Sequence, residues 1–191
     1  MTNLQGKSVG LFSLGFALGA LTVAILVATA GTQLAQQVSA QSDGLPQIGL
    51  PITGLRLADI HDTFNQGRAG GRPHGATDIM APRGTPVLAV DSGTIVKLFT
   101  SRDGGLTVYQ FDSSQVYCYY YAHLDRYAEG VAERTAVKPG DCLGYVGSTG
   151  NARSVGPHLH FGITRIGPEK HWWGGQSIDP YPILIQALKR K

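Results

Sequence analysis

Two histidines stand two residues apart near the end of the chain, in the segment GPHLHFGI at 156–163. Side chains along a β-strand alternate between its two faces, so His158 and His160 should project from the same face. Leu159 and Phe161 should face the other way, toward a core. Two imidazoles on one strand face can bind a metal ion, or they can be exposed or hydrogen-bonded residues without a metal. The segment therefore predicts a strand with one chemically active face.

A second candidate site lies upstream, in HGATDIMAP at 74–82. His74 and Asp78 are four residues apart, and on a strand this even spacing would place both on one face. Imidazole and carboxylate are both ligand types that Zn²⁺ accepts. The alternative is a turn aspartate with an unrelated surface histidine nearby.

A third candidate is His123, at the end of the aromatic segment YYYAHLD at 119–125. Four of the six histidines of the chain thus fall in three short, largely apolar segments. A buried imidazole needs a partner, and one shared metal ion would supply partners for several rings at once. A catalytic zinc site uses three protein ligands and keeps one position open. Two histidines would then remain to accept a proton from water and to stabilise an oxyanion.

The segments that must position these residues read as short strands joined by turns. Glycine accounts for 26 of the 191 residues, a density that helices tolerate poorly and tight turns tolerate well. Runs of β-branched and aromatic residues predict strands at 86–91, 93–99, 106–111, 116–124, 142–147 and 158–164. One short helix is expected in PILIQALK at 182–189. The pattern is typical of a compact, mainly antiparallel β domain.

An apolar N-terminal segment precedes this domain. Residues 9–31 carry no charge and, as a helix, would span about 34 Å, enough to cross a hydrocarbon core of about 30 Å. We interpret residues 1–31 as a cleaved signal peptide or as an uncleaved membrane anchor, which the length of the apolar run favours. Residues 32–50 are expected to form a linker. Residues 51–191 are expected to form a domain in the periplasm or elsewhere outside the cytoplasm, attached to the cytoplasmic membrane if the segment is not cleaved.

The charge of the chain gives no indication of a nucleic-acid partner. Sixteen Lys and Arg residues stand against thirteen Asp and Glu residues, for a formal net charge of +3, and they are scattered apart from a basic C-terminal end. No nucleic acid is therefore expected among the partners.

The two cysteines, Cys118 and Cys142, both fall on predicted strands. In an exported protein they could form a disulfide. Alternatively, they could remain buried thiols that pack as small core residues. The sequence leaves both alternatives open.

The ordered motifs HxxxD, AHL, GxTG and GPHLHF resemble those of the lysostaphin-type (LytM-domain) zinc metallopeptidases, and the resemblance extends from about residue 63 to residue 180. The resemblance implies a mainly β fold: an antiparallel β-sandwich or barrel-like LytM domain, a duplicated hybrid motif, with a groove above one zinc ion. The implied zinc ligands are His74, Asp78 and His160. The implied catalytic pair is His123 and His158.

The resemblance also implies the reaction, zinc-dependent hydrolysis of peptide bonds in the stem peptides or cross-links of peptidoglycan. Some members of the family have lost ligands and act as non-catalytic activators of other wall hydrolases, and a zinc-containing wall-binding module is a third alternative. All five positions are filled here, which favours an enzyme. The family commonly has glycine two residues after the first histidine, whereas here Ala76 stands at that position and Gly75 comes one residue earlier. The family often has glutamate directly after HLHF, whereas this chain has Gly162.

Two further groups of residues could take part in binding. The loop arginines Arg68, Arg72 and Arg153 could contact carboxylates of a stem peptide, although solvated loop arginines are the more favoured interpretation. Trp172 and Trp173 could form one wall of the groove or cap the core. Capping is favoured, because paired aromatic residues near a chain end usually bury area.

Overall fold

A computed structural model describes residues 45–68, 71 and 73–190 of the chain. The chain divides into two compact units, Met1–Leu45 and Pro46–Lys191, and all the elements below belong to the second. The apolar segment at 9–31, predicted to be a signal or an anchor, lies outside the described residues. Within the described part, none of the helices has the length and apolar character needed to cross a membrane.

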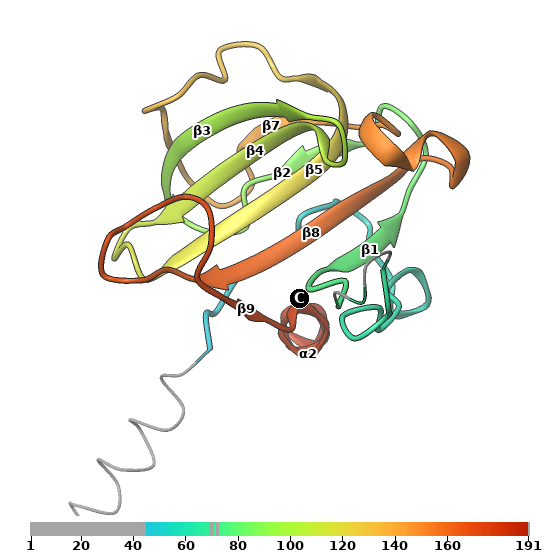
Figure 1. Cartoon of the computed structure of the whole chain (residues 1–191), viewed down its shortest axis with the longest axis horizontal. Helices are drawn as coiled ribbons and strands as arrows, with labels where there is room; N and C mark the ends of the chain where they lie inside the picture. Colours follow the sequence, from blue (N-terminus) through green and yellow to red (C-terminus); the bar gives the residue numbers. More distant parts are fainter. Residues whose placement is uncertain (1–44, 69–70, 72, 191) are drawn as a thin grey trace, which may run out of the picture. The chain divides into compact units, whose positions relative to one another are not determined.

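The described strands form a nine-stranded antiparallel sheet (Figure 1). Its main path runs through β1 (Thr77–Met80), β8 (His158–Arg165), β5 (Tyr117–Tyr127), β4 (Gly105–Asp112), β3 (Gly93–Ser101) and β6 (Ala136–Val137). Off this path, β2 (Pro86–Leu88) pairs with β7 (Cys142–Val146), β7 also pairs with β5, and β9 (Gln176–Ile178) pairs with β8. The prediction of a mainly antiparallel β domain is confirmed. The nine described strands are connected in one hydrogen-bonded sheet that forks.

The fork lies in β5, which changes its partner partway along one edge. Residues Tyr117–Ala122 pair with β8, and Leu124–Tyr127 pair with β7. His123 stands at the point of change and has a φ of 61°. This left-handed backbone conformation is uncommon for residues other than glycine. The sheet therefore opens at one of the predicted catalytic residues.

One face of the sheet covers the main hydrophobic core. Along β8 the side chains of Leu159, Phe161 and Ile163 are fully buried in this core, as the alternation of the sequence predicted for the first two. His160 and Gly162 lie on the opposite face. The face that carries the candidate chemistry is therefore separated from the core by the sheet itself.

Three helical segments complete the described part: η1 (Leu57–Asp59), η2 (Gly150–Ser154) and α2 (Pro180–Lys189). The C-terminal helix α2 contains the predicted helical segment, and its residues Ile183 and Leu184 belong to the main core. Its start is fixed by Asp179, whose carboxylate accepts a hydrogen bond from the backbone N–H of Tyr181 at 2.9 Å.

The compact unit begins earlier than the expected domain start at residue 51. Ile48 is buried in the main core, and the N–H of Gly49 donates to the carbonyl oxygen of Val90 at 2.7 Å. The Pro and Gly residues of this stretch give it the composition of a linker, but its apolar side chains pack on the domain. The end of the expected linker therefore belongs to the folded unit.

Both cysteines are free thiols in the structure. Strand β7 starts at Cys142 and pairs with the Leu124–Tyr127 end of β5. Cys118 lies near the other end of β5, about 30 Å from Tyr127 along the strand. Of the two alternatives left open by the sequence, the structure shows the one without a disulfide.

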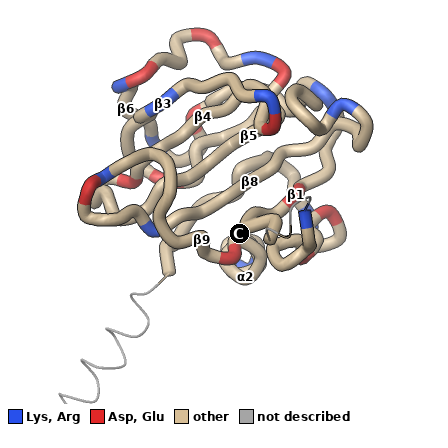
Figure 2. The backbone as a smooth tube through the Cα atoms, in the orientation of Figure 1, with Lys and Arg blue, Asp and Glu red and all other residues tan. Residues whose placement is uncertain are grey.

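Lys and Arg positions are interspersed with Asp and Glu positions along the described backbone (Figure 2). Strand β8 has its only charged residue, Arg165, at its end. The electrostatics of the candidate site are therefore set by groups in direct contact with it.

Candidate metal centre and active site

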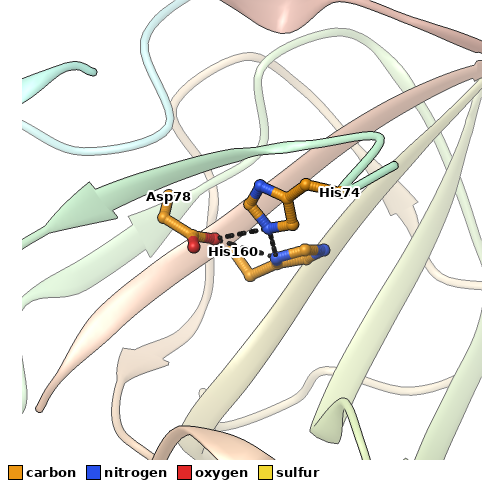
Figure 3. A group of neighbouring side chains, drawn as sticks. All are labelled: His74, Asp78 and His160. Carbon is orange, nitrogen blue, oxygen red and sulfur yellow. Dashed lines mark hydrogen bonds and ion pairs between the residues drawn. The ribbon is translucent and has the colours of Figure 1, made fainter. Parts of the chain in front are cut away.

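Three side chains from two distant parts of the sequence bring one atom each to a common point (Figure 3). Nε2 of His74 lies 2.9 Å from Nδ1 of His160 and 3.1 Å from Oδ1 of Asp78. Nδ1 of His160 lies 2.9 Å from the same carboxylate oxygen. These three residues are the predicted zinc ligands, and the structure brings them together.

The pairing of β1 with β8 places two of these residues side by side. Asp78 stands directly opposite His160 in the antiparallel register. Directly opposed side chains on one face of a sheet have Cβ atoms about 4.5–5.5 Å apart, which is close enough for a carboxylate to touch an imidazole. The register of the sheet therefore positions two of the three candidate ligands.

His74 reaches the site by a different route from the one expected. It precedes β1, and four residues of continuous strand would have carried it about 13 Å from Asp78. Instead, Gly75 has a φ of 69° and turns the chain, and the N–H of His74 donates to the carbonyl oxygen of Gln66 at 2.8 Å. The expectation that a shared strand face unites His74 and Asp78 was therefore wrong, because a turn unites them.

The hydrogen bonds of His74 show that this site fits a metal ion. Its Nδ1 lies 3.0 Å from the carbonyl oxygen of Thr63, an atom that can only accept, so Nδ1 carries the proton. Nε2 then turns a lone pair toward Oδ1 of Asp78. Two lone pairs at 3.1 Å repel unless a proton or a metal ion stands between them. Two imidazole nitrogens and one carboxylate oxygen are a ligand set that Zn²⁺ accepts.

Arg68 holds the second oxygen of the Asp78 carboxylate. Its Nη2 donates to Oδ2 at 2.8 Å, which leaves Oδ1 directed at the two rings. Burial alone would raise the pKa of Asp78, but its contacts with the rings of His160 and His74 outweigh burial and hold that pKa well below the usual range. Arg68 was expected to be solvated or to bind substrate. No motif in the sequence indicated that Arg68 contacts Asp78.

The two remaining histidines lie beside the candidate ligands. The ring centroids of His123 and His158 are 4.8 Å apart, and that of His123 is 5.5 Å from that of His160. Nε2 of His158 lies 3.9 Å from Oδ1 of Asp78. The structure therefore gathers all five predicted site residues around one point.

Backbone carbonyls fix the protons of this histidine pair. Nδ1 of His123 donates to the carbonyl oxygen of Thr149, and Nδ1 of His158 donates to that of Gly156, each at 2.9 Å. In the neutral form of each ring, Nε2 is then the proton acceptor. Burial, reinforced by the neighbouring rings of His160 and His158, lowers the pKa of His123 to about 4. At neutral pH its ring is therefore uncharged and can act as a base.

Gly147 holds the backbones of the histidine pair together. Its carbonyl oxygen accepts a hydrogen bond from the N–H of His158 at 3.1 Å. A Cβ at this position would lie 2.4 Å from the backbone nitrogen of Asp125 and 2.8 Å from the carbonyl oxygen of His123. No side chain fits in this space, which explains the first glycine of the GxTG motif.

The five residues line a groove of about 580 Å³. Its other lining residues include Arg68, Arg102, Tyr120 and Val155. A separate hollow of about 350 Å³ beside α2 has neither histidine nor carboxylate among its lining residues and lies apart from this chemistry. Only the first hollow therefore combines space for a ligand with reactive groups.

The residues that the sequence analysis missed act mostly through their backbones. The carbonyl oxygens of Thr63, Thr149 and Gly156 orient three of the rings, and every residue type carries a carbonyl. Thr149 belongs to the GxTG motif and Gly156 to the GPHLHF motif, whereas Thr63 belongs to neither. Of the other two arginines, Arg153 is exposed on η2 and Arg72 lies outside the described residues.

The chain belongs to peptidase family M23. The pattern of that family, described as Peptidase family M23, matches residues 72–180, more than half of the chain. The matched region contains all five site residues and every strand of the sheet. The suspected resemblance to lysostaphin-type peptidases is thereby confirmed at the level of the family.

Individual relatives carry related names. The chain is 36% identical over 124 residues to the L-Ala--D-Glu endopeptidase of Bacillus subtilis, an alignment covering 62% of this chain and 36% of that protein. It is 39% identical over 90 residues to the peptidoglycan DD-endopeptidase ShyC of Vibrio cholerae, covering 47% and 20%. The chain thus spans less than half the length of either relative.

Solved structures share the fold. The catalytic domain of the antimicrobial peptidase lysostaphin from Staphylococcus simulans matches with a TM-score of 0.56 and 30% identity, over 66% of this chain and 91% of that domain. A zinc-containing peptidase from Vibrio cholerae matches with a TM-score of 0.51 and 26% identity, over 70% and 36%. The sheet described above is therefore the lysostaphin fold.

Proposed function

We propose that this protein is a zinc-dependent endopeptidase that hydrolyses peptide bonds in the stem peptides or cross-links of peptidoglycan. The observation that carries the proposal is the convergence of His74, Asp78 and His160 next to His123 and His158 in one groove. The names of the two relatives, an L-Ala--D-Glu endopeptidase and a peptidoglycan DD-endopeptidase, support the substrate. The zinc content of the Vibrio cholerae structure supports the metal.

In this proposal His74, Asp78 and His160 hold one zinc ion. When bound, zinc acts as a Lewis acid that polarises a carbonyl group and lowers the pKa of water. Nε2 of His123 or of His158 takes the proton of the attacking water. Once protonated, a ring can donate a hydrogen bond to the oxyanion and return the proton to the leaving amine. The carbonyls of Thr149 and Gly156 keep both rings oriented for these steps.

We further propose that the domain works outside the cytoplasm, where peptidoglycan lies. The apolar residues 9–31 support export, either as a cleaved signal or as a membrane anchor. The polar residues that follow would then connect this segment to the folded unit.

The test is hydrolysis of isolated, cross-linked peptidoglycan by the full-length chain, with and without a chelator. Release of new peptide termini, identified by mass spectrometry, would support the proposal and name the bond. Release must disappear on chelation and return when zinc is added back. A protein that binds zinc but releases nothing would refute the enzyme and favour a non-catalytic activator or a wall-binding module.

A further inference from the structure

An aromatic surface adjoins the groove, formed by Phe99, Tyr109, Tyr120, Trp172 and Trp173. Tyr120 lines the groove, and its ring centroid lies 5.6 Å from that of His160. From Tyr120 the series continues to Tyr109 at 4.6 Å and from there to Trp172 at 4.7 Å. The rings of Phe99 and Trp173 lie 5.4 and 5.0 Å from that of Trp172. Successive ring contacts thus lead from a candidate zinc ligand to the outer surface.

The register of the sheet explains why these rings follow one another without a gap. Gly162, Tyr120 and Tyr109 are direct neighbours across β8, β5 and β4. Gly162 stands two residues after His160 and faces the same side of the sheet. A Cβ at Gly162 would lie 3.5 Å from the Cβ of Tyr120, an ordinary contact distance, so Tyr120 lies directly beside β8 on this face. The sheet face that carries the metal ligand therefore continues into the aromatic rings.

The two tryptophans have different roles on this surface. Trp172 is half-buried and covers a small second cluster of Phe111, Cys118 and Ile166, so capping was the right expectation for it. Trp173 is 55% exposed and stacks on His171 with ring centroids 4.3 Å apart, so capping was the wrong expectation for it. Phe99 is 41% exposed. Large apolar side chains that gather at the surface beside a groove mark a binding site.

The chemistry of this surface suits a sugar. None of its five side chains carries a charge at neutral pH, so a ligand would be held by packing rather than by ion pairs. Aromatic rings offer flat apolar faces, and tyrosine and tryptophan add a polar edge. The C–H faces of pyranose rings pack on such faces, and sugar hydroxyls can hydrogen-bond to the edges. A polysaccharide therefore fits better than a charged partner.

The distance to the metal centre agrees with a particular polysaccharide. The three ring-to-ring steps place Trp172 no more than about 15 Å from His160. An extended peptide covers about 3.3–3.6 Å per residue, so about four residues are long enough to span this separation. In peptidoglycan, peptides of this length are attached directly to the glycan strand. A stem peptide in the groove would bring its own glycan to the aromatic surface.

We propose that the aromatic surface binds the glycan strand whose stem peptide occupies the groove, with Phe99 and Trp173 as the exposed contacts. The choice of ligand rests on the proposed function. The contacts that carry it are the unbroken ring series and the exposure of its two outer members.

The first test measures binding without catalysis. Trp172 and Trp173 are the only two tryptophans of the chain, so intrinsic tryptophan fluorescence reports on this surface alone. The full-length chain is titrated with glycan strands freed of their peptides. We expect a saturable change in fluorescence, and a rise in Kd of about fivefold or more in Phe99→Ala, which keeps both tryptophans. Leu57→Ala is the matched control, because Leu57 is a 62% exposed apolar residue on η1.

Glycan strands that leave the fluorescence unchanged would overturn the proposal, and so would a Phe99→Ala variant that binds them as well as the natural chain. Either result would point to another occupant, such as a protein or a lipid surface. If Phe99→Ala fails to fold by circular dichroism, Trp173→Ala replaces it, with Trp172 still reporting. None of these outcomes depends on peptide hydrolysis, so a failure of the proposed activity would be recognised separately.

The second test uses the reaction. Cross-linked peptide dimers are prepared with their disaccharides attached and again after the disaccharides have been removed. Phe99→Ala and Trp173→Ala should lower kcat/KM for the glycosylated dimers by about fivefold or more and leave kcat/KM for the bare dimers unchanged. An equal fall on both substrates would contradict glycan binding by the aromatic surface.

Discussion

Arg68 donates a hydrogen bond to Oδ2 of Asp78 at 2.8 Å, on the far side of the carboxylate from the histidine rings. The other oxygen, Oδ1, is the one that faces His74 and His160. Partners of this kind fix the orientation of metal ligands and tune their basicity. The loop that carries Arg68 therefore supports the candidate metal centre from outside it.

Removing this support should weaken metal binding. We expect Arg68→Gln to raise the Kd for zinc by about 10- to 100-fold, the usual cost of losing a partner that orients a ligand. Zinc affinity is measured by competition with a chromogenic chelator. Arg56→Gln is the control, because Arg56 pairs with Asp59 on the surface. Equal affinities in the two variants would show that Asp78 needs no help from Arg68.

Substitution of the two histidines of the HxH motif should have different effects on zinc content. His160→Ala removes a candidate ligand, so we expect loss of both zinc and activity. His158→Ala removes a proton acceptor only, so zinc content should stay near one ion per chain while kcat falls by about 10²-fold or more. Metal analysis of the two purified variants separates these roles. Equal zinc loss in both would contradict the division of labour.

The strained backbone at His123 allows a sharper comparison. Its φ of 61° is comfortable for glycine and costs other residues about 1–2 kcal/mol. His123→Gly and His123→Ala both remove the imidazole and should both abolish hydrolysis. His123→Gly should nevertheless have the larger free energy of unfolding, by about 1 kcal/mol. Denaturant titration measures the difference. Equal stability of the two variants would mean that the fork in β5 relaxes without the ring.

The strands were predictable from sequence because their signals are local. The alternation in HLHFGIT and the aromatic run in YCYYYAHL specify extended chain and its two faces without reference to the rest of the protein. The same holds for the C-terminal helix, with Asp179 at its N-cap and proline at its start. Spacing within the HxH motif likewise predicted a shared face for His158 and His160.

The fork in β5 was not predictable, because it depends on which strands pair. Nothing in the run from Tyr117 to Tyr127 shows that its first half pairs with β8 and its second half with β7. The route of His74 depended on the φ of Gly75, which the strand interpretation did not consider. The carbonyls that orient the rings are backbone atoms, so no residue type marks them.

The free cysteines should differ in reactivity. Burial, together with the carboxylate of Asp112, raises the pKa of Cys118 to about 12, so almost none of it is thiolate near pH 8. Cys142 is only half-buried. We expect iodoacetamide to label Cys142 in the native chain and both cysteines after denaturation, as read by peptide mass spectrometry. If iodoacetamide labels neither cysteine even after denaturation, the two cysteines form a disulfide instead.

Two buried threonines next to the candidate metal centre should respond in opposite ways to the same substitution. Thr77 is fully buried, and its hydroxyl has no hydrogen-bond partner, so Thr77→Val should raise the free energy of unfolding by up to about 1 kcal/mol. The hydroxyl of Thr63 accepts from the N–H of Asp78 at 3.1 Å and donates to the carbonyl oxygen of Ala76 at 3.4 Å. Thr63→Val should therefore lower the free energy of unfolding by about 1–2 kcal/mol.

The same pair of variants also links stability to the site. Thr63→Val frees the backbone of Asp78 and disturbs the segment whose carbonyl orients His74, so zinc affinity should fall along with stability. Thr77→Val touches neither contact and should leave zinc affinity unchanged. Denaturant titration measures the free energy of unfolding of each variant, and chelator competition measures its affinity for zinc. A destabilised Thr77→Val would mean that its hydroxyl has a partner, such as a buried water, and that the core beside β1 is more polar than its protein contacts indicate.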